Sequence, residues 1–501
     1  MLFHTDFKNN TLLKYNPKII CFEKDNFEFE NDDIKALSEG YYLEQTPQEQ
    51  HFNLSYKAFT DIFKGAYIFV CQNKKRNNVK IYNDLLSKAY IFYYNNEDFF
   101  ACSSNYFELI NLLRQKNIKL DYDCDALNYF IKAGVFKGHS TYFEQVKFLK
   151  AFEYIEIDNT AQIKNIPYPE PISDISFNEA VDKAYALFEQ GSNAIINKNK
   201  KYNKSHVCSL SGGMDSRAIF LQLIKNDIKP IYTFCYAQKG SKDESISNAI
   251  AKDFGSQHIF YDISGGEFIK NRNSIIEQNQ GQMVFSGSTG AYDAIRQVKA
   301  NNIGLVYLGI GGGEIMGDII TEAGETPIGN VPKANYIKNL DDIRVCMNSA
   351  LAIGGVAQSA SPFLYEDLFL FLMRLPAIYK LRRRLYVAMF KKYMPNKYCT
   401  TMFRGKIGNV FAKPLRIMSY IFYIIFKKNK YNMNPFELWW QNNDGFKDYI
   451  NNSFYDDIKA LQGFDTSRLN REFDAADVYK KTNIISLSFM LKILKSSNGV
   501  Y

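Results

Sequence analysis

A short run of small and acidic residues, SLSGGMDSR at 209–217, carries the residue types best suited to chemistry in this 501-residue chain. A glycine pair lets backbone N–H groups approach phosphate oxygens closely, and flanking hydroxyls add hydrogen-bond donors. These residues are Ser211, Gly212, Gly213 and Ser216. Asp215 would repel such an anion unless it held a cation, so we expect Mg²⁺ there with Asp215 as its metal ligand. The run is not a GxxxxGK[ST] loop, so it does not indicate transfer of a γ-phosphate.

The chain around this run predicts the elements that would position it. An apolar strand at 206–210 leads into the run and a helix at 217–226 leaves it, so the positive end of the helix dipole points at the same anion. Further strands are expected at 230–236, 257–263 and 304–310, and further helices at 244–254 and 291–302. This alternation predicts a doubly wound parallel sheet, whose ligands bind beyond the C-terminal strand ends.

A proline-rich segment divides the chain. Three of the 13 prolines fall within 164–176, which predicts an extended linker. Ser176 and Glu179 then form a capping box at the start of a helix. Before the linker, β-type runs are expected at 66–71, 79–82, 89–94, 99–102 and 154–157, and helices at 106–115 and 125–133. We therefore expect an α+β domain at 1–163, the linker at 164–176, an α/β domain at 177–400 and a mainly helical part at 401–501.

Composition and charge narrow the range of partners. The net charge is +8 with no run of five like charges, so we expect no nucleic-acid partner. Eight cysteines without a CxxC pair indicate reduced thiols in a cytoplasmic protein, and five scattered histidines argue against a His-based zinc site. The apolar run at 417–426 is shorter than the roughly 20 residues that cross a membrane. We expect it to form a buried helix, with a weak membrane-surface contact as the alternative.

Several other segments occur in a recognisable order. They are KGAY at 64–67, KAYIFYY at 88–94, FACS at 100–103, GSKD at 240–243, the helix at 291–302, SPFL through LP at 361–376, and RGKIG at 404–408. Together with SGGMDS, they resemble the PP-loop ATP pyrophosphatase superfamily, and within it the asparagine synthetase family, over nearly the whole chain. The resemblance implies an adenine nucleotide α-hydrolase-like fold for the α/β domain. For residues 1–163 it implies a degenerate Ntn-type, class II glutamine amidotransferase-like domain.

The resemblance also implies a reaction and its residues. Members of the family use ATP and Mg²⁺ to adenylate a carboxylate, release pyrophosphate, and form an amide with ammonia or another amine. The cofactor-binding residues implied are Leu210, Ser211, Gly212, Gly213, Asp215, Ser216, Phe234, Asp243, Gly309 and Gly311. The catalytic residues implied are Glu314, Arg404 and Lys406, with Lys406 stabilising the departing pyrophosphate.

Two departures from the family pattern bear on the reaction. Glutamine-using members carry a catalytic cysteine at position 2, whereas this chain has Leu2, and its Cys21 is internal. The second glycine-rich turn reads GIGGGEIMG at 309–317, where the family has approximately SGEGSDEVFGG. Ile310 and Gly313 thus replace two acidic residues, with Asp243 and Asp318 as possible substitute metal ligands. These changes argue against synthesis of free asparagine.

Three functions follow from these residues. The first is an asparagine synthase-related ligase that forms an amide with a small-molecule carboxylate and has no glutaminase activity of its own. The second is a degenerate homologue that binds nucleotide and acts as a partner or regulator. The third is a tailoring enzyme that acts on a carboxylate of a surface glycan or a peptide.

Overall fold

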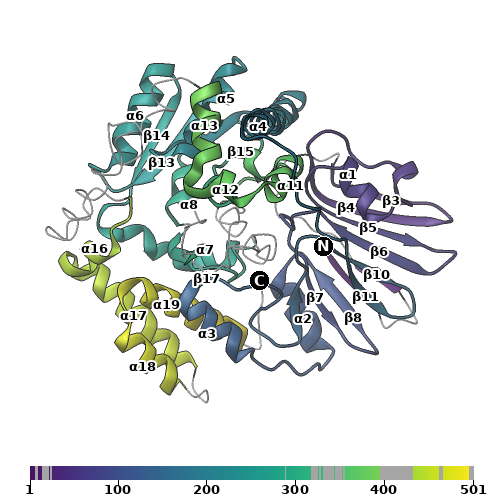
Figure 1. Cartoon of the computed structure of the whole chain (residues 1–501). Helices are drawn as coiled ribbons and strands as arrows, with labels where there is room; N and C mark the ends of the chain where they lie inside the picture. The colour runs from purple at the N-terminus through teal and green to yellow at the C-terminus, as the bar shows by residue number, and fades with distance from the viewer. Residues whose placement is uncertain are drawn as a thin grey trace.

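The architecture of the chain comes from a computed structural model, which describes residues 1–5, 10–13, 22, 25–287, 289–316, 325–326, 329–330, 344, 353, 356–394, 433–461 and 466–495. Two antiparallel sheets built from the first 165 residues lie on one side of the molecule (Figure 1). A parallel sheet and its helices form the opposite side, and the C-terminal helices lie below that sheet in this view. The predicted mixed α/β fold class is confirmed.

The N-terminal half consists of four layers. A five-stranded sheet has the order β2-β1-β8-β7-β9, and a six-stranded sheet has the order β11-β10-β6-β5-β4-β3. Their strands are β1 Leu2–Thr5, β2 Asn10–Leu13, β3 Glu28–Glu30, β4 Ile34–Tyr42, β5 Gly65–Asn73, β6 Asn78–Asn83, β7 Phe92–Asn95, β8 Phe100–Ser103, β9 Val146–Phe148, β10 Glu153–Ile157 and β11 Ala161–Asn165. The apolar residues between the two sheets form one buried cluster that includes Phe3, Val70 and Ile155.

Helices cover the outer faces of these sheets. Helix α1 (Tyr56–Ile62) packs on the six-stranded sheet, where Phe59 stacks on Phe69 at 4.7 Å between ring centroids. Helix α2 (Tyr106–Gln115) packs on the five-stranded sheet, where Tyr106 meets Phe92 edge-on at 5.1 Å. Helix α3 (Cys124–Ala133) follows α2 and ends at Gly134, which has a φ of 72°.

Helix α4 (Phe177–Lys201) leads from the N-terminal half into the parallel sheet. It begins with the predicted capping box, because Ser176 N donates to Glu179 Oε2 at 2.9 Å and Glu179 N donates to Ser176 Oγ at 3.3 Å. The sheet that follows has the order β14-β13-β12-β15-β18 with every pair parallel. Its elements are β12 His206–Ser209, α5 Met214–Lys225, β13 Ile231–Ala237, α6 Lys242–Phe254, β14 Gln257–Asp262, α7 Arg272–Gln278, α8 Thr289–Arg296, β15 Val306–Tyr307, α9 Gly312–Met316 and β18 Ser359–Ala360.

Successive residues of β12 face opposite sides of the parallel sheet, and each side is covered by a helix. Val207 packs in the cluster that holds Ala294 of α8, whereas Cys208 packs in the cluster that holds Ala218 of α5. The predicted doubly wound sheet is therefore confirmed, with helices on both faces.

The remaining elements are mainly helical. They are α11 Glu366–Arg374, α12 Ala377–Lys380, α13 Arg384–Tyr393, α16 Phe436–Asn442, α17 Asp444–Ala460, α18 Ser467–Ala475 and α19 Val478–Lys495, together with the short hairpin of β16 Glu325–Thr326 and β17 Gly329–Asn330. Helix α19 lies beside α3, where Asn483 Nδ2 donates to the Ile131 carbonyl at 3.1 Å (Figure 1). None of the helices in the described ranges is long and apolar enough to cross a membrane.

Buried ion pairs join the two halves of the chain. The fully buried Glu366 of α11 accepts from Lys88 Nζ at 2.7 Å and from Gly65 N at 3.1 Å. Lys198 of α4 pairs with the buried Asp25 at 2.5 Å between Nζ and Oδ2. Because each carboxylate has a charged partner from the other half, removing one partner of a pair would leave the other charge buried without compensation.

Two elements of the α/β half are shorter in the structure than predicted. The helix expected at 291–302 ends at Arg296, where Gln297 N and Val298 N donate to carbonyls three residues back and tighten the last turn. The strand expected at 304–310 is Val306–Tyr307, since the chain then enters the second glycine-rich turn.

Candidate functional site

The loop at 210–213 joins β12 to α5 and holds its shape through its own hydrogen bonds. The hydroxyls of Ser211 and Ser216 lie 3.0 Å apart, and Ser211 N donates to Ser216 Oγ at 3.0 Å. Gly213 N donates to Ser211 Oγ at 3.1 Å. An incoming anion must therefore replace these partners or bind the first-turn N–H groups of α5, whose N-cap, Gly213, has no side chain to cap them.

A second predicted segment, GSKD, packs directly on this loop. Ser241 caps α6 by accepting from Glu244 N at 3.3 Å. The first turn of α6 places the buried Asp243 against the loop, where its Oδ1 accepts from Gly212 N at 3.0 Å. The structure thus brings together the ends of β12 and β13, and Asp243 contacts the loop backbone itself.

The second glycine-rich turn, after β15, packs against Asp215. A Cβ atom at Gly312 would lie 2.5 Å from Asp215 Cγ, and one at Gly309 would lie 2.9 Å from Asp215 Cβ. Gly311 has a φ of 82°, and a Cβ there would lie 2.6 Å from Leu364 Cδ2. In this structure the glycines therefore make room for the Asp215 side chain as well as for a close approach of backbone.

The predicted SPFL segment braces this turn from the other side. Ser361 Oγ donates to the Ile310 carbonyl at 2.6 Å, and residues Pro362–Leu364 form a buried 3-10 turn. Four segments that are far apart in the sequence thus meet beyond the C-terminal ends of β12, β13, β15 and β18. This is the edge at which doubly wound sheets bind ligands.

The carboxyl groups of Asp215 and Glu314 interact electrostatically at this edge. Burial raises the pKa of the Asp215 carboxyl to about 6, and the negative charge of Glu314 adds to the rise. That pKa is lowered in turn by the hydroxyl of Tyr386, the charge of Arg383 and the N–H of Gly313. Burial also raises the pKa of Glu314, against the effect of Arg383. A divalent cation would remove the repulsion between the two carboxylates.

The donor set fits Mg²⁺ carried by a nucleotide. Among the residues that the structure describes, no cluster of three or more His, Cys, Asp or Glu side chains could hold a metal ion. Mg²⁺ in nucleotide sites commonly takes one or two carboxylates, with phosphate oxygens and waters completing the octahedron. Asp215 and Glu314 supply that number of carboxylates, so both would hold the ion together with ATP.

Two of the predicted cofactor-binding residues, Leu210 and Phe234, lie at the junction of β12 and β13. Leu210 is fully buried, and its N–H donates to the Phe234 carbonyl at 2.8 Å. This bond extends the parallel pairing of β12 and β13 by one residue beyond Ser209. The backbone of β13 therefore lies next to the loop, as a base-binding role for this edge requires.

Two contributors to the site had no signal in the sequence. Tyr386 donates its hydroxyl to Asp215 Oδ1 from α13, 171 residues away. Arg383 precedes that helix and carries a left-handed backbone with φ of 61°. Gly312 was missed as well, although its place in a run of three glycines was a usable signal. Arg404 and Lys406, like Asp318 and the apolar run at 417–426, lie outside the described residues.

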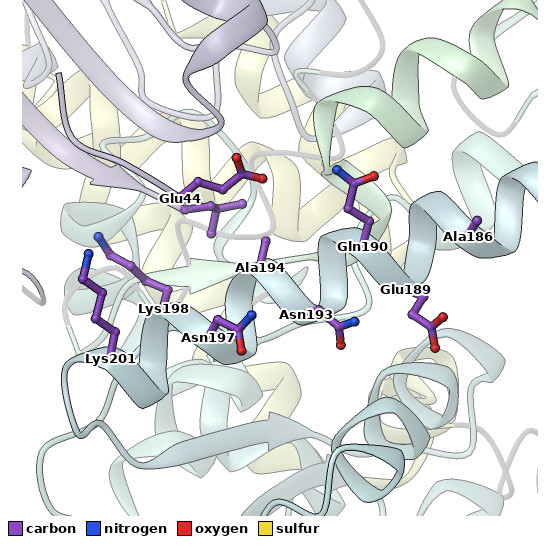
Figure 2. Close-up of a pocket in the computed structure, with 10 residues that line it drawn as sticks. Glu44, Ala186, Glu189, Gln190, Asn193, Ala194, Asn197, Lys198 and Lys201 are labelled. Carbon is purple, nitrogen blue, oxygen red and sulfur yellow. The ribbon is translucent and has the colours of Figure 1, made fainter.

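A separate cavity of about 600 Å³ runs along α4 (Figure 2). Its lining includes Leu43 and Glu44, which follow β4, and residues of α4 spaced three and four apart. Several of its charges are engaged already, because Glu44 accepts from Tyr365 OH at 3.1 Å, Lys198 pairs with Asp25, and Glu189 pairs with Lys225. None of the lining residues belongs to the loop at 210–213.

One of three comparisons with known proteins matches a family model, over part of the chain. A family model described as asparagine synthase matches residues 203–319, which include the loop, the GSKD segment and the second glycine-rich turn. A search of curated proteins finds no match. Among solved structures, the chain is similar to a glutamine phosphoribosylpyrophosphate (PRPP) amidotransferase from B. subtilis complexed with ADP and GMP. The identity is 9%, the match covers 47% of this chain and 72% of that chain, and the TM-score is 0.19.

Proposed function

We propose that the chain is an ATP-dependent ligase that adenylates a carboxylate and then forms an amide, a proposal supported by the match of residues 203–319 to the asparagine synthase family model. The observation that carries the proposal is the meeting of the SGGMDS loop with the turn that bears Glu314, so that the charge of Glu314 acts on the Asp215 carboxyl beside a helix N-terminus whose N-cap has no side chain. A phosphate-binding helix end beside a metal-binding carboxylate pair is the arrangement that nucleotide chemistry needs.

The reaction has two displacement steps. A carboxylate oxygen of the substrate attacks the α-phosphorus of ATP, and the bond to the bridging oxygen breaks so that pyrophosphate leaves. An amine nitrogen then attacks the acyl-adenylate carbonyl, loses a proton to solvent or a base, and AMP leaves with the shared carboxylate oxygen. Bound Mg²⁺ supplies neutralising charge to the phosphates.

The chain's own residues would bind and orient the reactants. The first-turn N–H groups of α5 face the phosphates, and the β12–β13 junction at Leu210 holds the base. Lys406 would stabilise negative charge on the departing pyrophosphate. Holding the carboxylate and the α-phosphate in attack geometry supplies a large part of the rate.

The products of ATP consumption test this proposal. We expect AMP and pyrophosphate, released only with Mg²⁺ and a suitable carboxylate from a panel that includes amino acids, sugar acids and peptides. Asp215→Ala should abolish release, whereas Asp182→Ala, which removes an exposed carboxylate of α4, should leave it unchanged. ADP and phosphate as products, or wild-type turnover by Asp215→Ala, would overturn the proposal.

We also propose that ammonia or a substrate amine, rather than glutamine, supplies the nitrogen. Leu2 lies in β1 with no nucleophile at that position. Burial raises the pKa of the Cys71 thiol to about 11 and that of Cys102 to about 12, so neither is a thiolate at neutral pH. Glutamate release from glutamine above a no-enzyme control would contradict this, and Cys21→Ser should not change any synthetase activity.

The changes at Ile310 and Gly313 support a second candidate, a homologue that binds nucleotide without turnover. It predicts measurable ATP affinity with no pyrophosphate release for any acid in the panel. A tailoring enzyme for a surface glycan or a peptide would show the ligase chemistry with a sugar-acid or peptide carboxylate, so the same panel separates all three.

A further inference from the structure

Among the described residues, Tyr386 is the tyrosine whose hydroxyl donates a hydrogen bond to Asp215, the aspartate of the SGGMDS loop. Its side chain is fully buried in α13, and its hydroxyl donates to Asp215 Oδ1. The ring is held on two sides, edge-on to Phe363 at 5.8 Å and tilted on Phe390 at 4.6 Å between centroids. Because packing fixes the ring, the direction of the hydroxyl is fixed as well.

The second glycine-rich turn also contacts the Asp215 carboxylate. Gly312 packs so closely that no Cβ fits, and the N–H of Gly313 donates to the carboxylate. Asp215 is therefore held by contacts from both α9 and α13, two elements about 70 residues apart in the chain. A carboxylate held in this way has lost most of its rotamer freedom before any ligand arrives.

We propose that Tyr386 is a positioning residue, which orients the Asp215 carboxylate for the divalent cation that accompanies ATP. This inference rests on the proposed function. The Tyr386 hydroxyl and the Gly313 N–H each occupy one lone-pair direction of the carboxylate, which leaves the other lone pairs for the ion. Groups that hydrogen-bond a metal ligand set its orientation, and their removal typically lowers metal affinity by about 10- to 100-fold.

The geometry also separates this role from general structural support. Phe at position 386 would keep both ring contacts and lose only the hydroxyl. Tyr393 lies seven residues later on the same helix and donates its hydroxyl to Asp182 at 2.5 Å, a carboxylate on the exposed face of α4. Tyr393→Phe is therefore a matched control, because it removes the same atom from the same helix at a site without nucleotide chemistry.

The test is a titration of the full chain with Mn²⁺, followed by electron paramagnetic resonance, in the presence of α,β-methylene-ATP. We expect Tyr386→Phe to weaken Mn²⁺ binding by about 10- to 100-fold, and Tyr393→Phe to change it by less than about twofold. Nucleotide affinity in EDTA should stay the same in both variants. A change in that metal-free affinity equal to the loss of Mn²⁺ affinity would show structural damage and overturn the positioning role.

Two further outcomes distinguish this inference from the proposed function. If the wild type binds Mn²⁺ with nucleotide and Tyr386→Phe binds it equally well, the positioning role fails and the proposed function stands. If the wild type binds no Mn²⁺ with nucleotide, both fail together. Should Tyr386→Phe unfold, Phe390→Leu loosens the ring without touching the hydroxyl. Phe390→Leu should then lower Mn²⁺ affinity by less than the roughly 10- to 100-fold expected for Tyr386→Phe. An unchanged Mn²⁺ affinity would overturn the positioning role of Tyr386.

Discussion

Replacing Gly312 with alanine should displace the Asp215 carboxylate. The added Cβ would lie 2.5 Å from Asp215 Cγ and 2.7 Å from Oδ1, about 0.9 Å short of the 3.4 Å at which ordinary contact begins. Because Tyr386 donates its hydroxyl to the same Oδ1 atom, a shift of the Asp215 carboxylate should strain or break that hydrogen bond. A misplacement of about 1 Å at a reacting site can cost about 100-fold in rate.

We therefore expect Gly312→Ala to lower carboxylate-dependent pyrophosphate release by about 100-fold. Overpacking should also destabilise the fold by about 1–3 kcal/mol. Gly309→Ala should have a smaller effect, since its Cβ would lie 2.9 Å from Asp215 Cβ and 3.1 Å from Ser216 N. Rates and thermal melts of the two variants measure both effects.

Gly445→Ala is the matched control for these variants. It lies in α17, where a Cβ would meet Asn443 Oδ1 at an ordinary 3.4 Å. That change should leave activity unaltered and stabilise the helix slightly, by up to about 1 kcal/mol. If Gly312→Ala released pyrophosphate at the wild-type rate, the close packing of the turn on Asp215 would have no functional role and the reasoning would be refuted.

Three further predictions concern other parts of the chain. Lys406→Ala should lower kcat by about 10²–10³-fold with little change in nucleotide affinity, and Lys406→Arg should restore little of the lost rate. Equal losses of kcat and of nucleotide affinity would contradict a role of Lys406 in the transition state. Lys88→Met should lower the free energy of unfolding in urea by about 3–5 kcal/mol, because it leaves the buried Glu366 carboxylate without its charged partner. The double variant Lys88→Met, Glu366→Leu should recover most of that loss. Additive losses would contradict the pairing. Burial lowers the pKa of His206 to about 4 in the folded state. Stability that is present above pH 6.5 should therefore be lost as the pH falls toward 4, by up to about 3 kcal/mol. His206→Gln should reduce this dependence of stability on pH in thermal melts.

The nucleotide loop and its sheet could be predicted because local chemistry determines them. The helix expected at 217–226 starts three residues earlier, at Met214, and the capping box at Ser176 is present as expected. Each of these features depends on residues within one turn of the chain, and a sequence records such spacing directly.

Elements that depend on distant partners were missed. Strand β4 went unpredicted because its sequence, IKALSEGYY, lacks regular alternation, and Gly40 adopts a φ of 114° opposite the backbone of β5. Pairing with β5 along its whole length stabilises this strand. Tyr386 was missed for a similar reason, since nothing near α13 in sequence indicates that it reaches Asp215.

The most direct measurement of the central claim is exchange of labelled pyrophosphate into ATP. Reversible adenylation needs only a carboxylate, ATP and Mg²⁺, so the amine is not required. We predict exchange that depends on one carboxylate class and disappears in Asp215→Ala. Nucleotide binding without exchange for any carboxylate would contradict the ligase and leave a binding protein, and no binding at millimolar ATP with Mg²⁺ would contradict the site itself.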